Sequence, residues 1–337
     1  MLLQSNLLFG KEIKDKNFFG ISFPPFADEK QIEFTLKHLK TLNINKIRIA
    51  IDWRYREPTR GAYYWYPMDM RMKAAEKNDI SVLLSVHDIE PEWAYDKSQN
   101  DESIPEKELF EKFIREVLKR YKIYKIQFGN EWEKKYLNEI EKFVEYNNIL
   151  YHAVKEISPD TIVVLGGITK TYSILKAFYL KNEIPVFSDM QFQPCYSEIW
   201  IKNKLDKIFS DTESINKIIY NVEYVFKNAQ YDEIDIHLYD DYRNWNEYLS
   251  ALPEEKPIIV SEFGGPNSEF ERIDQEYQAD KIRKYLQTVE SLPIKEAYYF
   301  KLMDSDTSYH KHSGLFDKNF NPKKSYWIFA EFLCKYK

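Results

Sequence analysis

The sequence contains little glycine and no long hydrophobic run. Only 9 of its 337 residues are glycine, and no Pro/Gly-rich linker or internal repeat divides the chain. No apolar stretch approaches the roughly 18 residues of a membrane-spanning helix, and the first residues lack the apolar core of a signal peptide. We therefore expect a single domain without a membrane partner, either cytoplasmic or secreted with its signal removed.

The sequence also has few cysteines, and neither sign of charge dominates it. The two cysteines, Cys195 and Cys334, lack metal-binding spacing, and we expect two unpaired thiols. The 48 basic and 54 acidic residues are interspersed and give a net charge of −6, so the composition predicts no nucleic-acid partner. No residue pattern implies a metal ion or an organic cofactor, and the sequence leaves the oligomeric state open.

Aromatic residues, in contrast, are abundant, with 26 Tyr, 22 Phe and 7 Trp. Most of them must pack in a core. A surplus of Tyr and Trp is also typical of a sugar-binding cleft, because flat rings stack on the C–H faces of pyranoses. Composition alone does not separate these two uses.

Short apolar runs alternate with amphipathic stretches along the whole chain. Runs bounded by breaking residues indicate strands, and apolar residues three or four apart indicate helices. We predict helices at residues 28–42, 67–78, 105–121, 138–157, 211–228, 274–292 and 325–336. We predict strands at residues 18–23, 45–52, 80–86, 126–132, 161–166, 233–238, 257–265 and 296–303.

Eight strands alternating with helices predict an α/β protein with a single (β/α)8 TIM barrel over residues 1–337. The region from about 167 to 231 exceeds normal loop length, and we expect it to form part of a wall or lid. A doubly wound open sheet is the alternative fold. It is disfavoured because no glycine-rich phosphate loop follows the first strand.

Two predicted strands end on a glutamate. Glu262 closes the seventh run and Glu131 closes the fourth. Strict alternation along the seventh strand places Ile258, Val260 and Glu262 on one face. A glutamate at the end of a buried strand is costly unless it is paired or used, and chemistry in such barrels sits at the carboxyl ends of the strands. The two glutamates are therefore our candidate catalytic pair.

Other strand-end residues could serve this pair. Alternation along the second strand points the Arg48 side chain into the barrel, where we expect it to keep a carboxylate ionised. We expect Tyr239 to donate a hydrogen bond to the same carboxylate. Asn130 carries an amide able to bind a sugar hydroxyl. His87 and His237 are further candidates for binding substrate. Trp53, Trp93 and Trp132 are candidate sugar platforms.

Two carboxylates that face each other across a barrel mouth suit the cleavage of glycosidic bonds. One protonates the leaving oxygen while the other attacks the anomeric carbon, and water then hydrolyses the covalent intermediate. The two roles divide because neighbouring carboxylates do not both ionise easily. For a retaining pair we expect a separation of about 5–5.5 Å rather than about 6.5–9.5 Å.

The motifs around these residues resemble those of glycoside hydrolase clan A, a group of retaining glycosidases on (β/α)8 barrels. The resemblance covers most of the chain. It implies that Glu131 is the acid/base and Glu262 the nucleophile. Within the clan the layout is most similar to family 39, with family 5 as the second choice. The matching segments are Arg48, residues 56–65, residues 91–94, Asn130 with Glu131, residues 237–239, residues 261–264, residues 313–317 and residues 322–324.

One departure from the clan pattern lies on the predicted eighth strand. Clan members often have a tryptophan there that floors the sugar site, but this strand has none. We expect Tyr299 or Phe300 to take its place. Lys301, if it points inward, would favour an acidic sugar.

Three other functions fit parts of this pattern. A transglycosylase would use the same intermediate with a sugar in place of water. A non-catalytic barrel would bind carbohydrate without cutting it. A metal-dependent barrel hydrolase would need clustered ligands, for which only His87, His237 and Asp304 are available. The sequence thus favours a retaining β-glycosidase with a carbohydrate as its partner.

Overall fold

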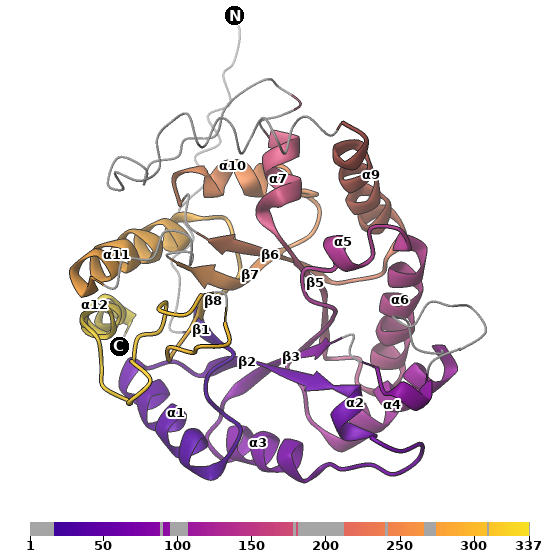
Figure 1. Ribbon diagram of the computed structural model, residues 1–337, viewed down its shortest axis with the longest axis horizontal. Helices are drawn as coiled ribbons and strands as arrows, with labels where there is room; N and C mark the ends of the chain where they lie inside the picture. The colour runs from indigo at the N-terminus through magenta and orange to yellow at the C-terminus, as the bar shows by residue number, and fades with distance from the viewer. Residues whose placement is uncertain are drawn as a thin grey trace, which may run out of the picture.

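The computed structural model describes residues 17–87, 90–94, 107–177, 180, 212–239, 242–265, 274–308 and 310–336. Eight parallel strands pair in chain order and close into a barrel, with the last strand beside the first (Figure 1). The predicted (β/α)8 barrel is therefore confirmed. The strands are β1 (Phe19–Ser22), β2 (Lys46–Asp52), β3 (Ser81–His87), β4 (Lys125–Phe128), β5 (Ile162–Ile168), β6 (Glu233–Tyr239), β7 (Ile258–Gly264) and β8 (Ala297–Phe300).

Helices surround the barrel in Figure 1. Four helices that the sequence analysis did not predict, α2, α5, α7 and α10, are short. The helices are α1 (Glu29–Leu42), α2 (Trp53–Arg56), α3 (Tyr66–Lys77), α4 (Lys107–Arg120), α5 (Trp132–Lys135), α6 (Ile140–Ile157), α7 (Lys170–Ala177), α9 (Thr212–Asn228), α10 (Trp245–Ser250), α11 (Gln275–Ser291) and α12 (Lys324–Leu333), with 3₁₀ turns η1 (Glu92–Ala94), η4 (Tyr242–Asn244) and η6 (Cys334–Tyr336).

Helices α7 and α9 belong to the region predicted to be elaborated, from about 167 to 231. Residues 178–179 and 181–211 of that region, with Cys195, lie outside the described residues. Cys334 is exposed and is a free thiol. In the described part of the chain, no helix combines the length and hydrophobicity needed to cross a membrane.

Helix α1 illustrates why these segments become helices. The side chain of Asp28 accepts a hydrogen bond of 2.9 Å from the backbone N–H of Gln31 and so caps the first turn. Ile32 and Leu39 are buried at helical spacing, and the helix ends at Asn43, whose φ of 56° is left-handed. The apolar face therefore packs inward while the ends of the helix are satisfied locally.

The lowest layer inside the barrel consists of charged side chains from the even-numbered strands. Lys46 contacts Glu296, and Lys125 contacts both Glu296 (2.8 Å) and Glu233. All four residues are less than 9% exposed. Burying charges is tolerated only when each one is compensated, and here two cations face two anions. The interior begins as a closed, balanced ion-pair network.

The next layers lead up to the carboxyl ends of the strands. Tyr298 lies above Gly20, where an added Cβ would come within 2.3 Å of the tyrosine ring. The apolar cluster inside the barrel consists of Leu83, Val164, Ile259 and Tyr298. Two residues beyond the charged layer on β2, β4 and β6 come Arg48, Gln127 and Asp235, all fully buried. The barrel interior is thus polar again where the candidate site begins.

Replacing Lys125 should test the charged layer. We expect Lys125→Met to lower the free energy of unfolding by about 3–5 kcal/mol, because two buried carboxylates would then share one cation. Urea denaturation at neutral pH measures this. The control is Lys119→Met, which removes an exposed pair with Glu116 and should cost less than about 1 kcal/mol. Equal losses for the two variants would contradict a stabilising role for the network.

Candidate active site

Glu262 reaches the barrel mouth because β7 is irregular. Ile259 packs inside the barrel, whereas Val260 packs in the core between sheet and helices. Strict alternation would therefore turn Glu262 outward with Val260. The register shifts where β7 pairs with β8, between Val260 and Phe263, and where β6 pairs with β7. The predicted shared face for Ile258, Val260 and Glu262 is wrong, because a bulge re-aims the glutamate.

Arg48 and Tyr239 hold the Glu262 carboxylate. An Nη1 N–H of Arg48 donates to Oε1 of Glu262, and the Tyr239 hydroxyl donates to Oε2. The Nη2 atom of Arg48 donates to Oδ1 of Asn130 at 2.6 Å. With its oxygen occupied, Asn130 presents its amide N–H groups as the available donors. The structure thus brings together four of the predicted site residues.

The environment of Glu262 favours its charged form. Burial acts to raise the pKa of this carboxyl, and the charge of Glu131 acts in the same direction. The positive charges of His237 and Arg48, with the hydrogen bond from Tyr239, outweigh both and hold the pKa below its ordinary value. Glu262 is therefore an ionised, immobile carboxylate at neutral pH.

Glu131 lies beyond the end of β4, which stops at Phe128 rather than continuing through residue 132 as predicted. The chain turns through Gly129, with φ of 77°, and Glu131, with φ of 50°. The backbone N–H of Glu131 donates to the carbonyl oxygen of Gly167 at 2.8 Å, which ties this turn to β5. The Glu131 side chain is one third exposed (34%). It is therefore the more accessible of the two carboxylates.

His237 joins the two carboxylates. Its Nδ1 atom lies 3.1 Å from Oε1 of Glu131 and 3.8 Å from Oε2 of Glu262. Because both distances start from one atom, these two oxygens are at most 3.1 plus 3.8 Å, or about 7 Å, apart. That limit is compatible with the separation of about 5–5.5 Å expected of a retaining pair. Both glutamates thus approach the same nitrogen of the His237 ring.

His237 is positively charged at neutral pH. Burial alone would lower its pKa, but Glu262, the hydrogen bond to Glu131 and the charge of Asp235 raise it to about 9. On the other side of the ring, Nε2 lies 3.3 Å from Oγ of Ser261 and 3.9 Å from Oδ2 of Asp235. Sequence reasoning missed Asp235 and Ser261. Side-chain alternation could have identified Asp235, because it lies two residues before His237 on β6 and therefore on the same face of the strand.

Two interactions fix this support. Asp235 accepts hydrogen bonds from both the backbone N–H and the hydroxyl of Ser261. Gly167 leaves room for the imidazole, since a Cβ there would lie 2.2 Å from Nε2 of His237. The missing side chain at residue 167 and the buried Asp235 carboxylate together set the position of His237.

Three predicted sugar-binding rings do not reach the site. Trp53, Trp132 and Tyr299 are 2%, 0% and 0% exposed. Trp53 stacks on Phe113 at 5.5 Å, and Trp132 stacks on Phe143 at 4.5 Å. A ring that is almost completely buried has no exposed face on which a pyranose could stack. The prediction that these three side chains bind substrate is therefore wrong, and they are part of the core.

The other predicted binding residues remain candidates. His87 at the end of β3 lies 3.2 Å from Asp52 at the end of β2, and both side chains are about one quarter exposed. Trp93 is partly buried and donates from Nε1 to the carbonyl oxygen of Glu57 at 2.8 Å. Lys301 directly follows β8, which ends before it, and is only 4% exposed.

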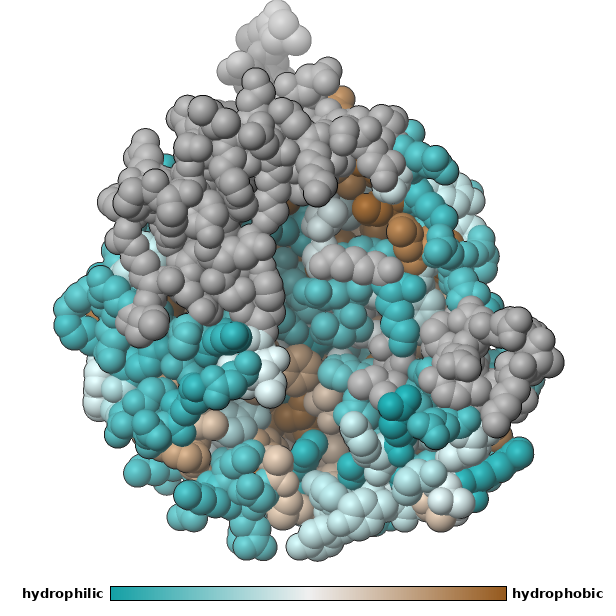
Figure 2. All heavy atoms as spheres, in the orientation of Figure 1, coloured by the Kyte–Doolittle hydropathy of each residue, from teal (hydrophilic) through white to brown (hydrophobic). Residues whose placement is uncertain are grey.

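Two aromatic side chains pack beside Tyr239. The sequence analysis did not single out His310 and named Phe300 only as an alternative to Tyr299. The Tyr239 ring stacks on His310 at 4.0 Å and lies 6.3 Å from the ring of Phe300. Phe23 is 6.4 Å from Phe300 and lies under the guanidinium of Arg48 at 4.5 Å. Side-chain alternation on β8 was the signal for Phe300, because Tyr299, its neighbour in the strand, packs in the core outside the barrel. In Figure 2 the surface is hollowed over the barrel, with hydrophilic and hydrophobic residues both in view.

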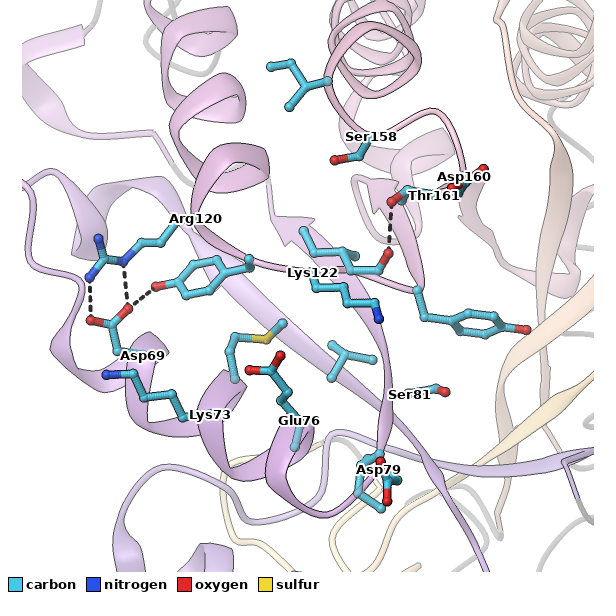
Figure 3. Close-up of a pocket in the computed structure, with 18 of the residues that line it drawn as sticks. Asp69, Lys73, Glu76, Asp79, Ser81, Arg120, Lys122, Ser158, Asp160 and Thr161 are labelled. Carbon is cyan, nitrogen blue, oxygen red and sulfur yellow. Dashed lines mark hydrogen bonds and ion pairs between the residues drawn. The ribbon is translucent and has the colours of Figure 1, made fainter.

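A second hollow lies at the opposite end of the strands. A pocket of about 1070 Å³ opens between α3 and the connections into β4 and β5 (Figure 3). Ser81, the first residue of β3, lines it. Asp69 there accepts hydrogen bonds from Arg120 at 2.7 Å and from Tyr121 at 2.9 Å. The pocket is separate from the two glutamates, which lie at the carboxyl ends.

Among the described residues, no group of three His, Cys, Asp or Glu side chains is arranged to hold a metal ion. The side chains described above make up the candidate site. It comprises one ionised carboxylate, one accessible carboxylate and two cations.

A (β/α)8 barrel with a carboxylate after each of the fourth and seventh strands is the arrangement of the clan A glycosidases. The sequence profile described as Cellulase (glycosyl hydrolase family 5) matches residues 9–299, which is most of the chain. The protein belongs to glycosyl hydrolase family 5. The clan predicted from the motifs is confirmed, but family 39, the first choice within it, is not confirmed.

Solved structures share the fold. An exo-beta-1,4-mannosidase, Op5Man5, from Opitutaceae bacterium strain TAV5 has a TM-score of 0.67 and 14% identity over 99% of this chain and 62% of that one. A family 39 glycoside hydrolase from Bacteroides cellulosilyticus WH2 has a TM-score of 0.62 and 16% identity over 96% and 65%. A beta-glucosidase from Exiguobacterium marinum has a TM-score of 0.63 and 15% identity over 96% and 99%.

The chain spans less than two thirds of the first two of these structures. A comparison with curated proteins finds no match. At such low identity these structures support the fold alone.

Replacing Asp235 should lower the pKa of His237, because the Asp235 charge helps to raise it. In the wild type we expect the imidazole C–H resonance of His237, identified by its absence in His237→Gln, to titrate with a midpoint near pH 9. Asp235→Asn removes one of three carboxylates around the ring and should lower the midpoint. A group with a raised pKa stabilises the fold below its unfolded pKa of about 6.5, and this stabilisation is lost as the pH rises toward 9.

The stability difference between wild type and His237→Gln should therefore shrink between about pH 6.5 and pH 9. Glu223→Gln, on the distant helix α9, serves as the control for removing a carboxylate. A wild-type midpoint near 6.5, or one that Asp235→Asn leaves in place, would contradict this account of the site.

Proposed function

We propose that this protein is a retaining glycoside hydrolase that cleaves β-glycosidic bonds of an oligo- or polysaccharide. Glu262 is the nucleophile and Glu131 is the acid/base. The observation that carries the proposal is the shared contact of both carboxylates with His237, at 3.1 and 3.8 Å. Arg48 and Tyr239 additionally hold Glu262 in its ionised form.

In the first step Glu262 attacks the anomeric carbon of the sugar. The bond to the leaving oxygen breaks while Glu131 transfers a proton to that oxygen, and the sugar becomes an ester of Glu262. The negative charge of Glu262 disfavours a second negative charge nearby, which helps Glu131 to carry the proton. The greater exposure of Glu131 suits its contact with a departing group that leaves toward solvent.

In the second step the charge of Glu262 is absent, because its oxygen is bonded to the sugar. The His237 cation then stabilises only the Glu131 carboxylate and Asp235. Glu131 accepts a proton from water, the water oxygen attacks the anomeric carbon, and the ester bond to Glu262 breaks. Asn130 is positioned beside Glu262 through Arg48, so its amide N–H groups can bind a sugar hydroxyl near the reaction centre.

The names of similar structures support β-linked substrates. One is called an exo-beta-1,4-mannosidase and another a beta-glucosidase, and both share the barrel of this chain. Reaction with a panel of sugars of different configuration identifies the sugar that the site accepts.

Covalent trapping tests the nucleophile. Incubation with a panel of activated 2-deoxy-2-fluoro β-glycosides should add one sugar mass, and peptide mapping should place it on Glu262, because the fluorine slows hydrolysis of the ester more than its formation. Glu262→Gln should remain folded, take up no label and lose at least about 10⁴-fold in turnover. A label on another residue, or a Glu262→Gln enzyme that still turns over, would refute the assignment.

Anion rescue tests the acid/base. Glu131→Ala should still form the glycosyl ester from substrates with a good leaving group, but the ester should persist because no base activates water. Added azide should restore turnover and give a β-glycosyl azide. Glu262→Ala is the matched control and should not give the β-azide. Full hydrolysis of unactivated glycosides by Glu131→Ala would rule out this role.

A further inference from the structure

The segment between β2 and α3 exposes an unusual concentration of aromatic rings. The described residues include seven large hydrophobic side chains that are at least 36% exposed. Three of these seven lie close together in the chain: Tyr55 at 57%, Tyr64 at 54% and Tyr66 at 65%. Such clustering is not expected of scattered surface residues and marks an interaction surface.

The backbone holds these rings outward. Tyr63 and Trp65 turn inward and stack on one another at 5.0 Å, and Trp65 continues the stack onto Phe113 at 6.1 Å. Tyr64 and Tyr66, on either side of Trp65 in the sequence, remain exposed. The tyrosine rings are thus presented by a segment anchored in the core, which reduces the entropy lost on binding.

A second hydrogen-bonded link fixes this segment. The backbone N–H of Tyr64 donates to the carbonyl oxygen of Arg56 at 2.7 Å, and Nη1 of Arg56 donates to the carbonyl oxygen of Tyr64 at 3.2 Å. The end of α2 is therefore tied to the residues that precede α3.

Four arginines belong to the same part of the chain, and the guanidinium of Arg56 lies 5.9 Å from the centre of the Tyr64 ring. In the described ranges, none of Arg54, Arg56, Arg60 and Arg71 forms an ion pair, whereas Arg120 is paired with Asp69. Arg54 donates from Nε to the carbonyl oxygen of Glu90 at 3.0 Å, and the buried Nε of Arg71 has no hydrogen-bond partner.

Two of these guanidinium groups are partly removed from water. Burial lowers the pKa of Arg56 and of Arg71, and the charge of Asp52 only partly opposes this effect. A guanidinium removed from water without a carboxylate partner is suited to binding an anion supplied by a ligand.

This surface continues from the candidate active site. Asp52 ends β2, the strand that carries Arg48, and lies 3.2 Å from His87 at the end of β3. Helix α2 begins at the next residue, and Figure 1 shows it beyond the end of β2. A glycan chain that enters the mouth along β2 therefore meets the exposed tyrosines and arginines next.

We infer that Tyr55, Tyr64 and Tyr66, with Arg54, Arg56, Arg60 and Arg71, form a subsite for an anionic stretch of the glycan. This inference rests on the proposed function, because it takes the ligand to be the glycosidase's own substrate. The tyrosine rings stack on pyranose C–H faces, and the guanidinium groups bind sugar carboxylates or sulfates. The net charge of −6 disfavours general attraction of polyanions, so binding of an acidic polymer must be local.

Native affinity electrophoresis tests the subsite. The Glu262→Gln enzyme, used so that no polymer is cut, should be retarded in gels that contain polygalacturonate or dextran sulfate, and not by uncharged hydroxyethylcellulose. The two anionic polymers distinguish carboxylate from sulfate recognition. Retardation should weaken with added salt, since screening reduces attraction between exposed charges.

Two paired variants locate the binding. Tyr64→Ala with Tyr66→Ala, and separately Arg60→Gln with Arg71→Gln, should each weaken the apparent affinity at least about tenfold. Matched controls are Tyr220→Ala, whose ring is 61% exposed on α9, and Arg283→Gln, exposed on α11, and both should bind as the parent does. Equal retardation of the paired variants and the controls, equal retardation by the uncharged polymer, or none by either anionic polymer would overturn the inference.

Covalent trapping separates this result from the catalytic proposal. The same paired substitutions in the active enzyme should leave labelling by a small fluoro-glycoside unchanged, because that probe is too short to reach the segment. Loss of retardation with intact labelling assigns the surface to glycan binding. Retardation that persists in an enzyme no fluoro-glycoside labels would instead uphold the surface and refute the retaining mechanism.

Discussion

The structure depends on compensating the charges that lie inside a closed barrel. At the lower end, Lys46 and Lys125 balance Glu233 and Glu296, and the layer is complete in itself. Higher up, the same even-numbered strands carry Arg48 and Asp235, and their partners come from elsewhere. Arg48 is compensated by Glu262, a residue of β7, and Asp235 by the hydrogen bonds of Ser261 and the charge of His237. The candidate active site is the layer in which these charges are compensated by groups on β6 and β7.

The positive and negative charges of this upper layer nearly balance, and this balance affects the proposed chemistry. Arg48 and His237 contribute two positive charges, and Glu131, Glu262 and Asp235 contribute three negative charges when all are ionised. The sum is one negative charge, and it is zero when Glu131 is protonated. In the proposed mechanism Glu131 gives up this proton while positive charge develops at the sugar. The site therefore gains negative charge as the oxocarbenium-like transition state forms, which stabilises that state more than the neutral substrate.

Sequence patterns predicted the barrel well because its strands are short apolar runs and its helices have clear periodicity. Parity also placed Arg48 correctly inside β2. The same reasoning failed for Glu262, since a bulge in β7 changes parity only through pairing with neighbouring strands. It failed for Glu131 in a similar way, since the left-handed turn after Gly129 is not visible in hydrophobic periodicity. Residue type identified both glutamates, but only tertiary structure aims them.

The aromatic residues show a different limit. Burial of a tryptophan depends on which helix packs over it, so Trp53 and Trp132 at the strand ends could not be distinguished from sugar platforms by sequence. Exposed rings are found farther along, in the segment after α2, where Tyr63 and Trp65 anchor the chain and leave Tyr64 and Tyr66 outside. Neighbouring residues of one short segment therefore provide both the anchor and the exposed rings. Because residues that pack inward fix the position of those that point outward, this segment can hold flat rings and unpaired arginines beside the mouth without disturbing the balanced charges within the barrel.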